Sequence, residues 1–236
     1  MVLAAFGKRQ QDGGPSEIPA RGCPRYVREV AIREILPGVF HWTAVHPGIR
    51  IEVSSYYVEP ARMLLDPLVP EEGLAWFETR SAPEHVLLTN RLHSRHTARF
   101  VEEFGCEVWT NREGLAHFGQ GGEIRDVAPR GFRAGELLPG GIESHEVGVL
   151  CPDETAFLIP GEVAALAVAD GVVRDADGPL AFVPDPLLGD DPEAVKRGLE
   201  EAYRRLCELD FDHLLLAHGQ PWIGGARAAL RAFAER

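Results

Sequence analysis

The sequence is poor in cysteine, has no long apolar run and shows no excess of basic residues. Its four cysteines are far apart and form no Cys-x-x-Cys pair: Cys23, Cys106, Cys151 and Cys207. Because 45% of the residues are hydrophobic, we expect a core rather than a disulfide framework, in a reducing, intracellular setting. No apolar run approaches the length of a membrane span, and residues 1–7 lack the length and the basic start of a secretory signal. The sequence therefore predicts a cytoplasmic protein with no membrane partner.

Acidic residues outnumber basic ones. Asp and Glu total 36 against 24 Lys and Arg, which sets the formal net charge at −12 for 236 residues. A negative balance disfavours non-specific binding to nucleic acid, whose phosphates attract basic proteins. The length and the apolar content suffice for a sizeable core. We expect no nucleic-acid partner, whereas composition specifies neither the substrate nor the oligomeric state.

The N-terminal segment differs in composition from the rest. Residues 7–24 are polar and rich in Gly, Pro and Gln, so residues 1–26 are predicted to form a flexible arm and residues 27–236 a single domain. Short apolar and β-branched runs then follow one another, separated by turns that contain Pro and Gly: 31–36, 39–45, 50–59 and 62–65. This spacing predicts an antiparallel meander.

Helices and strands are interspersed in the remainder of the chain. The patterns predict helices over 70–80, 94–104, 112–117, 192–208 and 226–234. They predict strands over 85–89, 106–110, 123–127, 141–145, 148–151, 156–160 and 212–217, and a hairpin or insertion over 172–183. The order suits an α+β fold in which two sheets pack face to face with helices outside.

Histidines and acids stand at or just after the ends of the predicted strands. They are Asp66, His93, His96, His145, Glu162 and His218. In a sheet fold, polar groups at strand ends converge on one rim, where binding sites form. Two arginines, Arg91 and Arg95, are interleaved with the first two histidines. A guanidinium cannot ligate a metal and stays charged, so these arginines oppose a metal at the same rim.

These segments together resemble the metallo-β-lactamase fold superfamily, nearest to its glyoxalase-II-like hydrolases, over residues 36–222. Residues 90–96, Asn-Arg-Leu-His-Ser-Arg-His, match the family's Thr-His-x-His-x-Asp-His motif. Three shorter matches follow: Glu-Ser-His145 for Pro-Gly-His, Gly-Glu162 for Gly-Asp, and Ala-His218-Gly for Gly-His-Gly. The run Leu-Leu-Asp66 resembles an early strand of the family that ends in Asp. The resemblance implies a four-layer αββα sandwich.

The resemblance also implies where metal ions would bind. The family's first metal takes residues that correspond here to Arg91, His93 and His145. Its second metal takes residues that correspond to Arg95, His96 and His218, and Glu162 stands where an Asp bridges the two. Each set has lost one ligand to arginine, so we expect at most one metal ion, and Asp66 and the arginines would line the site.

Two interpretations remain open from the sequence. In the first, one zinc, iron or manganese ion binds to His96, Glu162 and His218, and an activated water attacks an ester, thioester or lactone; His93 or His145 would assist. In the second, no metal binds, because the arginines bring positive charge into the cavity and Arg95 pairs with Glu162. A metal-free rim would then bind a small anionic ligand or a protein partner.

Overall fold

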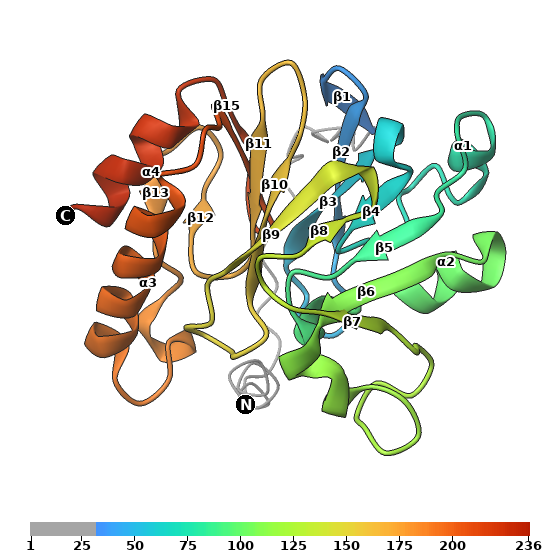
Figure 1. Cartoon of the computed structure of the whole chain (residues 1–236), viewed down its shortest axis with the longest axis horizontal. Helices are drawn as coiled ribbons and strands as arrows, with labels where there is room; N and C mark the ends of the chain where they lie inside the picture. The colour runs from blue at the N-terminus through green and yellow to red at the C-terminus, as the bar shows by residue number, and fades with distance from the viewer. Residues whose placement is uncertain (1–31) are drawn as a thin grey trace, which may run out of the picture.

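The computed structural model describes residues 32–236, and the predicted arm over residues 1–26 lies outside the described part of the chain. Two large β-sheets stack face to face, and helices cover the outer side of each (Figure 1). The αββα sandwich predicted from the sequence is therefore confirmed. Between residues 32 and 236, no helix is long and apolar enough to cross a membrane.

The first sheet begins with the predicted meander. In chain and spatial order, the described strands are β1 (Arg33–Leu36), β2 (Val39–Val45), β3 (Glu52–Val58), β4 (Met63–Leu65), β5 (His85–Leu87), β6 (Glu107–Asn111) and β7 (Arg130–Phe132). Strands β1 to β4 are antiparallel, and β4 to β7 are parallel. Helices α1 (Ala75–Glu78) and α2 (Thr97–Phe104) lie in the connections between the parallel strands. Parallel neighbours end at the same edge of a sheet, so the residues that follow β4 and β5 lie together.

The second sheet carries the C-terminal half of the chain. Its strand order is β15-β14-β11-β10-β9-β8. The bounds are β8 (Leu137–Leu138), β9 (Ile142–Glu146), β10 (Thr155–Ile159), β11 (Ala165–Val168), β14 (His213–Leu216) and β15 (Trp222–Ile223). Only the β11–β14 pair is parallel among these described strands, so these two also end at one edge. A separate hairpin joins β12 (Val173–Arg174) to β13 (Leu180–Ala181), as predicted over 172–183.

Apolar side chains fill the spaces between the layers. Tyr56, Leu65 and Phe157 belong to the core between the two sheets. Phe77 and Phe100 pack in the core under α1 and α2. On the other side, helices α3 (Pro192–Leu206) and α4 (Ala226–Ala234) cover the second sheet. Each large apolar side chain buried in this way stabilises the fold by about 1.5–3 kcal/mol.

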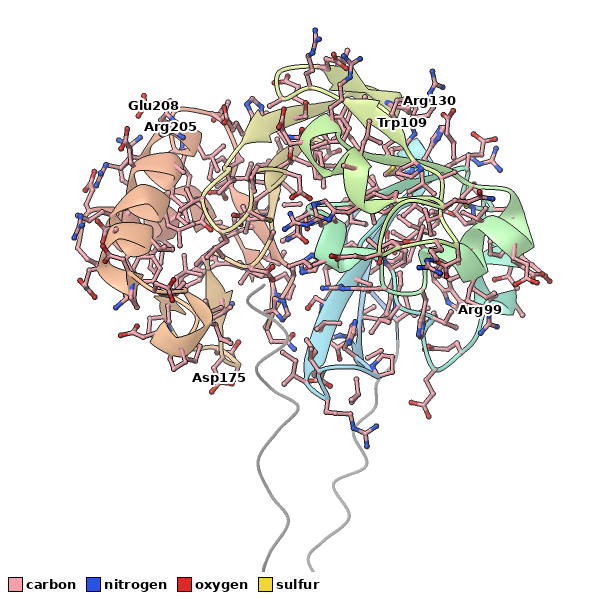
Figure 2. All side chains as sticks on the ribbon, turned by 90° about the horizontal axis from the view of Figure 1, so that it is seen from below. Arg99, Trp109, Arg130, Asp175, Arg205 and Glu208 are labelled. Carbon is pink, nitrogen blue, oxygen red and sulfur yellow. The ribbon has the colours of Figure 1, made fainter. Side chains whose placement is uncertain are left out.

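Helix α3 shows why the sequence favours this packing. Its buried residues recur at helical spacing, at Leu199, Ala202, Tyr203 and Leu206. The Asp191 carboxylate accepts a hydrogen bond from Ala194 N at 3.0 Å and so caps the first turn. Exposed polar residues mark the outer surfaces of the two helical layers at opposite ends of the molecule, with Arg205 at one end and Arg99 at the other (Figure 2).

Four local predictions were wrong or too long. Residues 123–127 form no strand beyond a single bridge between Phe118 and Ile124. Residues 148–151 form a turn, because Gly148 has a φ of 63° and both Val147 N and Gly148 N donate to Glu154 O. The helix predicted over 70–80 is confined to α1, since Gly73 adopts a φ of 77°, and α2 begins three residues later than predicted.

Candidate functional site

The candidate site lies where the carboxyl ends of four strands meet. In the first sheet, Asp66 follows β4 and residues 89–96 follow the parallel neighbour β5. In the second sheet, Asp170 follows β11 and His218 follows its parallel neighbour β14. The two sheets join at this edge, because Ser54 N of β3 donates to Ala217 O at 2.9 Å. Topology therefore brings four chain segments to one point.

His93 is the central side chain of this site and is buried. Its Nδ1 lies 2.8 Å from Asp66 Oδ2 and 2.8 Å from Thr89 Oγ1, and its Nε2 lies 3.0 Å from Asp170 Oδ1. His218 Nε2 lies 2.8 Å from the same oxygen of Asp170. The Asp170 carboxylate thus joins two histidines that come from different sheets.

Each carboxylate of this group is held in place by further donors. Thr89 donates to Asp66 through its backbone N at 2.9 Å and through its hydroxyl at 2.6 Å. Asn90 Nδ2 donates to Asp170 Oδ2 at 3.1 Å. Because both carboxylates are oriented by the turn that follows β5, the positions of His93 and of its partners are set together.

Opposite charges outweigh burial at His93. Burial alone lowers the pKa of this imidazole, but the carboxylates of Asp170 and Asp66 raise its pKa to about 9. Burial alone would raise the pKa of Asp170, but His93 and His218 bring this pKa well below its usual range. A protonated His93 therefore bridges the two carboxylates near neutral pH, and each ring nitrogen donates to one of them.

The ligand atoms of His93, Asp170 and His218 all lie within 4.8 Å of one another. We name these three residues the HDH cluster. Two imidazoles and one carboxylate are ligand types of catalytic zinc sites that keep a position open for water. The remaining nitrogen of His93 faces the Asp66 carboxylate, as is common for metal-binding histidines. The residues present therefore fit one metal ion, which would displace the proton on His93.

Arg91 is neutralised within the protein. Its backbone N donates to Asp153 Oδ2 at 2.6 Å, and its guanidinium pairs with the other oxygen of the same carboxylate. Asp153 is fully buried. This pair occupies the Arg91 side chain and leaves no open ligand position there.

Arg95 follows His93 in the chain and is bound differently from Arg91. Its Nη1 donates to the backbone carbonyls of Ser54 and Asp66, at 2.5 Å and 2.7 Å. Its Nη2 is buried and has no hydrogen-bond partner among residues 32–236. The predicted pair with Glu162 is wrong, because Glu162 is exposed in the turn between β10 and β11, at the opposite end of the sheet.

Two further predicted ligands lie outside the HDH cluster. His96 precedes α2, and its Nδ1 accepts a hydrogen bond from Val69 N at 3.0 Å. His145 pairs in register with Ala156, which packs in the core under α3 and α4. Residues paired across antiparallel strands share a face, so His145 lies on the helix side of the second sheet, with its Nε2 3.3 Å from Glu143 Oε2.

The sequence interpretation missed two acids. Asp170 ends the run Ala-Leu-Ala-Val-Ala-Asp, a strand followed by an acid, which is the signal sought at Gly161-Glu162. Glu154 precedes β10, is fully buried and accepts a hydrogen bond from Leu150 N at 3.2 Å through Oε2. Burial, together with the charge of Asp170, raises the pKa of Glu154 to about 8. The turn residues around Glu154 gave no sign of burial.

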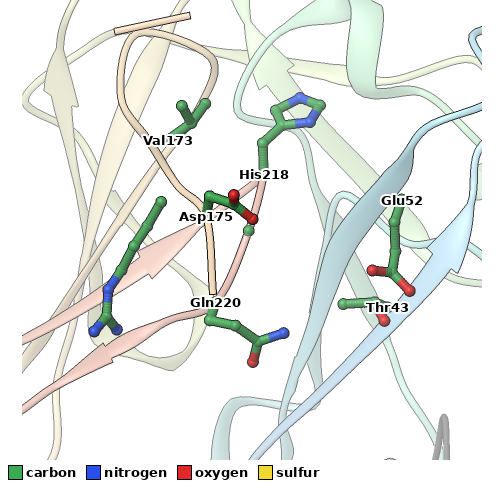
Figure 3. Close-up of a pocket in the computed structure, with 8 residues that line it drawn as sticks. Thr43, Glu52, Val173, Asp175, His218 and Gln220 are labelled. Carbon is green, nitrogen blue, oxygen red and sulfur yellow. The ribbon is translucent and has the colours of Figure 1, made fainter. Parts of the chain in front are cut away.

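A cavity reaches the site beside His218. It has a volume of about 270 Å³ and is lined by Thr43 and Glu52 from the β2–β3 hairpin, by residues 173–175 and by residues 218–220. Figure 3 shows Thr43 and Glu52 on one wall, with His218, Asp175 and Gln220 opposite. A small molecule in this cavity would therefore contact one member of the HDH cluster.

No protein-family model and no curated protein matches the sequence. Solved structures do match. A metallo-β-lactamase from Pontibacter korlensis has a TM-score of 0.61 at 15% identity, over 87% of this chain and 99% of that one. A Cronobacter sakazakii metallo-β-lactamase with a HARLDQ motif has a TM-score of 0.60 at 13% identity, over 85% and 88%. A metallo-β-lactamase family protein from Thermus thermophilus has a TM-score of 0.59 at 16% identity, over 86% and 78%. At these identities the likeness shows the fold.

Proposed function

We propose that this chain, which has the metallo-β-lactamase fold, is a hydrolase with a single divalent metal ion bound by the HDH cluster. The observation that carries the proposal is the approach of the three ligand atoms to within 4.8 Å of one another. Two histidines and a carboxylate suffice for one catalytic ion. A bound zinc, iron or manganese ion would act as a Lewis acid toward a carbonyl group and its attacking water. Esters, thioesters and lactones are the substrates that this chemistry favours.

The chain's own residues would hold the site ready. Asp66 and Thr89 fix the ring of His93 through Nδ1, so that Nε2 faces Asp170 within the HDH cluster. Asn90 orients the Asp170 carboxylate, and the cavity beside His218 provides access. A second ion is not part of the proposal, because neither Arg91 nor Arg95 can ligate a metal and Arg95 keeps its positive charge at the rim.

One observation favours a second candidate function, in which no metal binds. Each ring nitrogen of His93 faces a carboxylate, that of Asp66 or that of Asp170, so a proton on this ring would neutralise part of their charge. The same two carboxylates raise the pKa of His93 to about 9. Such a site is complete without a cation. The protein would then be catalytically silent and would bind a small anionic ligand or a protein partner at the rim.

Metal analysis of freshly purified protein tests the two candidates. We expect about one equivalent of metal per chain, and less than a tenth of that in Asp170→Asn or His218→Ala, because three ligands are few enough for each to be essential. His145→Ala is a matched control: it removes a half-buried histidine of the same sheet that lies outside the HDH cluster. Absence of metal from the unaltered protein, even after incubation with zinc, would favour the second candidate.

Activity provides the complementary test. The protein would be assayed with 4-nitrophenyl acetate, a short acyl thioester and γ-butyrolactone, before and after treatment with a chelator. We expect hydrolysis of at least one of these that is lost with the metal and restored by adding it back. Hydrolysis that survives complete metal removal would contradict the proposed role of the HDH cluster.

A further inference from the structure

The Arg95 guanidinium carries an unused donor inside the site. Its Nη1 is saturated by two backbone carbonyls, but its Nη2 is buried without a partner among the described residues. Buried polar groups are almost always hydrogen-bonded, and a charged donor is among the costliest to leave unpaired. The unused Nη2 therefore indicates an acceptor that does not belong to residues 32–236.

The position of Arg95 is imposed by its surroundings. Its φ of 40° lies in the left-handed region that non-glycine residues avoid, and Asp66, whose carbonyl it contacts, has a φ of 46°. A conformation of this kind persists only where neighbouring structure holds it. Geometry places the guanidinium beside the HDH cluster, because Nη1 binds the Asp66 carbonyl and the carboxylate of the same residue lies 2.8 Å from His93 Nδ1.

The nearby carboxylates are already engaged. Asp66 accepts from Thr89 and His93, through both of its oxygens. Asp170 accepts from Asn90, His93 and His218, also through both oxygens. Since a guanidinium repels cations and only donates hydrogen bonds, the missing acceptor is an oxygen from outside the described residues, and a negatively charged ligand oxygen fits best.

We propose that Arg95 Nη2 donates a hydrogen bond to an anionic oxygen of the ligand beside the HDH cluster, so that this guanidinium supplies the second positive charge of the site. The catalytic consequence rests on the proposed function. In ester hydrolysis, the oxygen of water adds to the carbonyl carbon, and the C=O pair moves to the carbonyl oxygen, which Arg95 holds. The pair then returns, the C–O bond to the leaving alkoxide breaks, and the alkoxide takes the proton that the water lost.

Arg91 does not share this role, although it belongs to the same motif. Its guanidinium is paired through Nη1 with Asp153, a fully buried carboxylate, so its charge is already neutralised within the protein. A ligand oxygen would gain little from a cation that another carboxylate holds. The structure thus separates the two arginines by function.

Anion binding by the metal-free protein tests the inference independently of catalysis. After chelation, the protein would be titrated with sodium acetate and with inorganic phosphate, and the ¹⁵N–¹H signals of arginine side chains would be followed by NMR. We expect at least one of the two anions to bind at millimolar concentration and to shift one buried arginine signal. In Arg95→Met that signal and the binding should both disappear. Arg99→Met, which removes an exposed arginine from α2, is the matched control and should bind as the unaltered protein does.

Kinetics then distinguish this inference from the proposed function. If the protein is a metal-dependent hydrolase, Arg95→Met should lower kcat by about 100-fold, with little change in KM and with one metal ion still bound. Anion binding that depends on Arg95 in a protein without metal or activity would support the inference and contradict the proposed function. Acetate and phosphate binding that is absent, or is unchanged in Arg95→Met, would overturn the inference whether or not metal binds. Circular dichroism of Arg95→Met shows that the variant is folded; if it is not, loss of anion binding by Arg95→Gln serves instead.

Discussion

Arg91 and Arg95 lie two positions before and two positions after His93, yet their charges are neutralised in different ways. The guanidinium of Arg91 meets a fully buried carboxylate, that of Asp153. The guanidinium of Arg95 meets only the carbonyls of Ser54 and Asp66, and its Nη2 has no partner in the described part of the chain. The charge of Arg91 is thus balanced within the protein, whereas Arg95 keeps an unpaired hydrogen-bond donor.

The difference shows that one residue type at two related positions can carry two roles. A carboxylate partner cancels the charge of Arg91 and fixes the turn that follows β5. Carbonyl partners orient Arg95, one of them from Asp66, but leave its net charge in place. An arginine offers no metal ligand at either position, but only Arg95 leaves an unbalanced cation beside the site.

The largest effect is expected from Asp153→Asn, which tests the pairing of Arg91 with Asp153. This change leaves Arg91 charged and largely buried without its partner, since 15% of the Arg91 side chain is exposed. Breaking a buried pair from one side costs about 3–5 kcal/mol, and the partial exposure favours the lower end. Urea denaturation should show this loss in the free energy of unfolding.

The double variant Arg91→Met with Asp153→Asn is the control for that result. It removes both charges together, so its loss of stability should be clearly smaller than the sum of the two single losses. Simple additivity would mean that the two side chains do not interact, and the contrast between the two arginines would collapse.

The next effect is the pH dependence of stability that arises from His41, which lies next to a residue that binds Arg95. His41 Nε2 lies 3.0 Å from Ser54 Oγ, and the carbonyl of Ser54 binds Arg95. Burial, with a smaller contribution from Arg33, lowers the pKa of His41 from 6.5 to about 4. The folded state therefore holds His41 neutral, and its contribution to stability is complete above pH 6.5 and is lost as the pH falls toward 4. The loss reaches about 3 kcal/mol, at roughly 1.4 kcal/mol for each pKa unit.

Unfolding free energies measured between pH 7 and pH 4 would check this prediction. Over that window the unaltered protein should lose about 3 kcal/mol relative to His41→Gln, because Gln does not titrate, whereas Glu154, whose pKa is raised to about 8, contributes equally to both proteins. Asp66 and Asp170, whose pKa values are lowered, lose their contributions only below the usual Asp range, so they act outside the window. An equally steep decline in His41→Gln would assign the effect to another group.

Arg95→Met is expected to have a smaller effect on stability, with opposite consequences for metal and for anions. Two buried carbonyls lose their donor, which costs about 1–3 kcal/mol. Removal of a positive charge beside the HDH cluster should raise zinc affinity by about 10-fold or more. Competition with a chromophoric zinc chelator would measure this. The Arg91→Met and Asp153→Asn double variant removes a neutral pair and should leave zinc affinity unchanged.

The sequence predicted the layers well and the ligand set only in part. Short apolar runs with turn residues between them indicated the meander, and the spacing of Leu199, Ala202 and Leu206 indicated α3. Strand ends pointed to His93 and His218, which the structure brings together. These features are local patterns of polarity, and such patterns can be read along a single chain.

The remaining errors concern the end of a strand that reaches the site and the face of the sheet to which a side chain points. No local sequence pattern contains either. Glu162 and Asp170 flank the same short strand, and only the antiparallel pairing of β10 with β11 determines which of them reaches the site. His145 lies near the correct end of β9, but its register with Ala156 turns it to the helix side. A shift of one residue reverses the face of every side chain in a strand.

The smallest predicted effect tests how far an unpartnered atom can be used as evidence. Tyr203 Oη is buried and, like Arg95 Nη2, has no hydrogen-bond partner within residues 32–236. It packs so closely over Gly171 that a Cβ there would lie 2.2 Å from it, so no ligand fits between them. Because the hydroxyl is neutral and enclosed, Tyr203→Phe should change the free energy of unfolding by less than about 1 kcal/mol. We expect a small increase in stability, since the change removes an unpaired buried hydroxyl. A larger loss in thermal or urea unfolding would show that a buried water serves this hydroxyl. A buried water would then also be the simplest partner for Arg95 Nη2. The role of Arg95 in binding a ligand would depend on the anion-binding experiment alone.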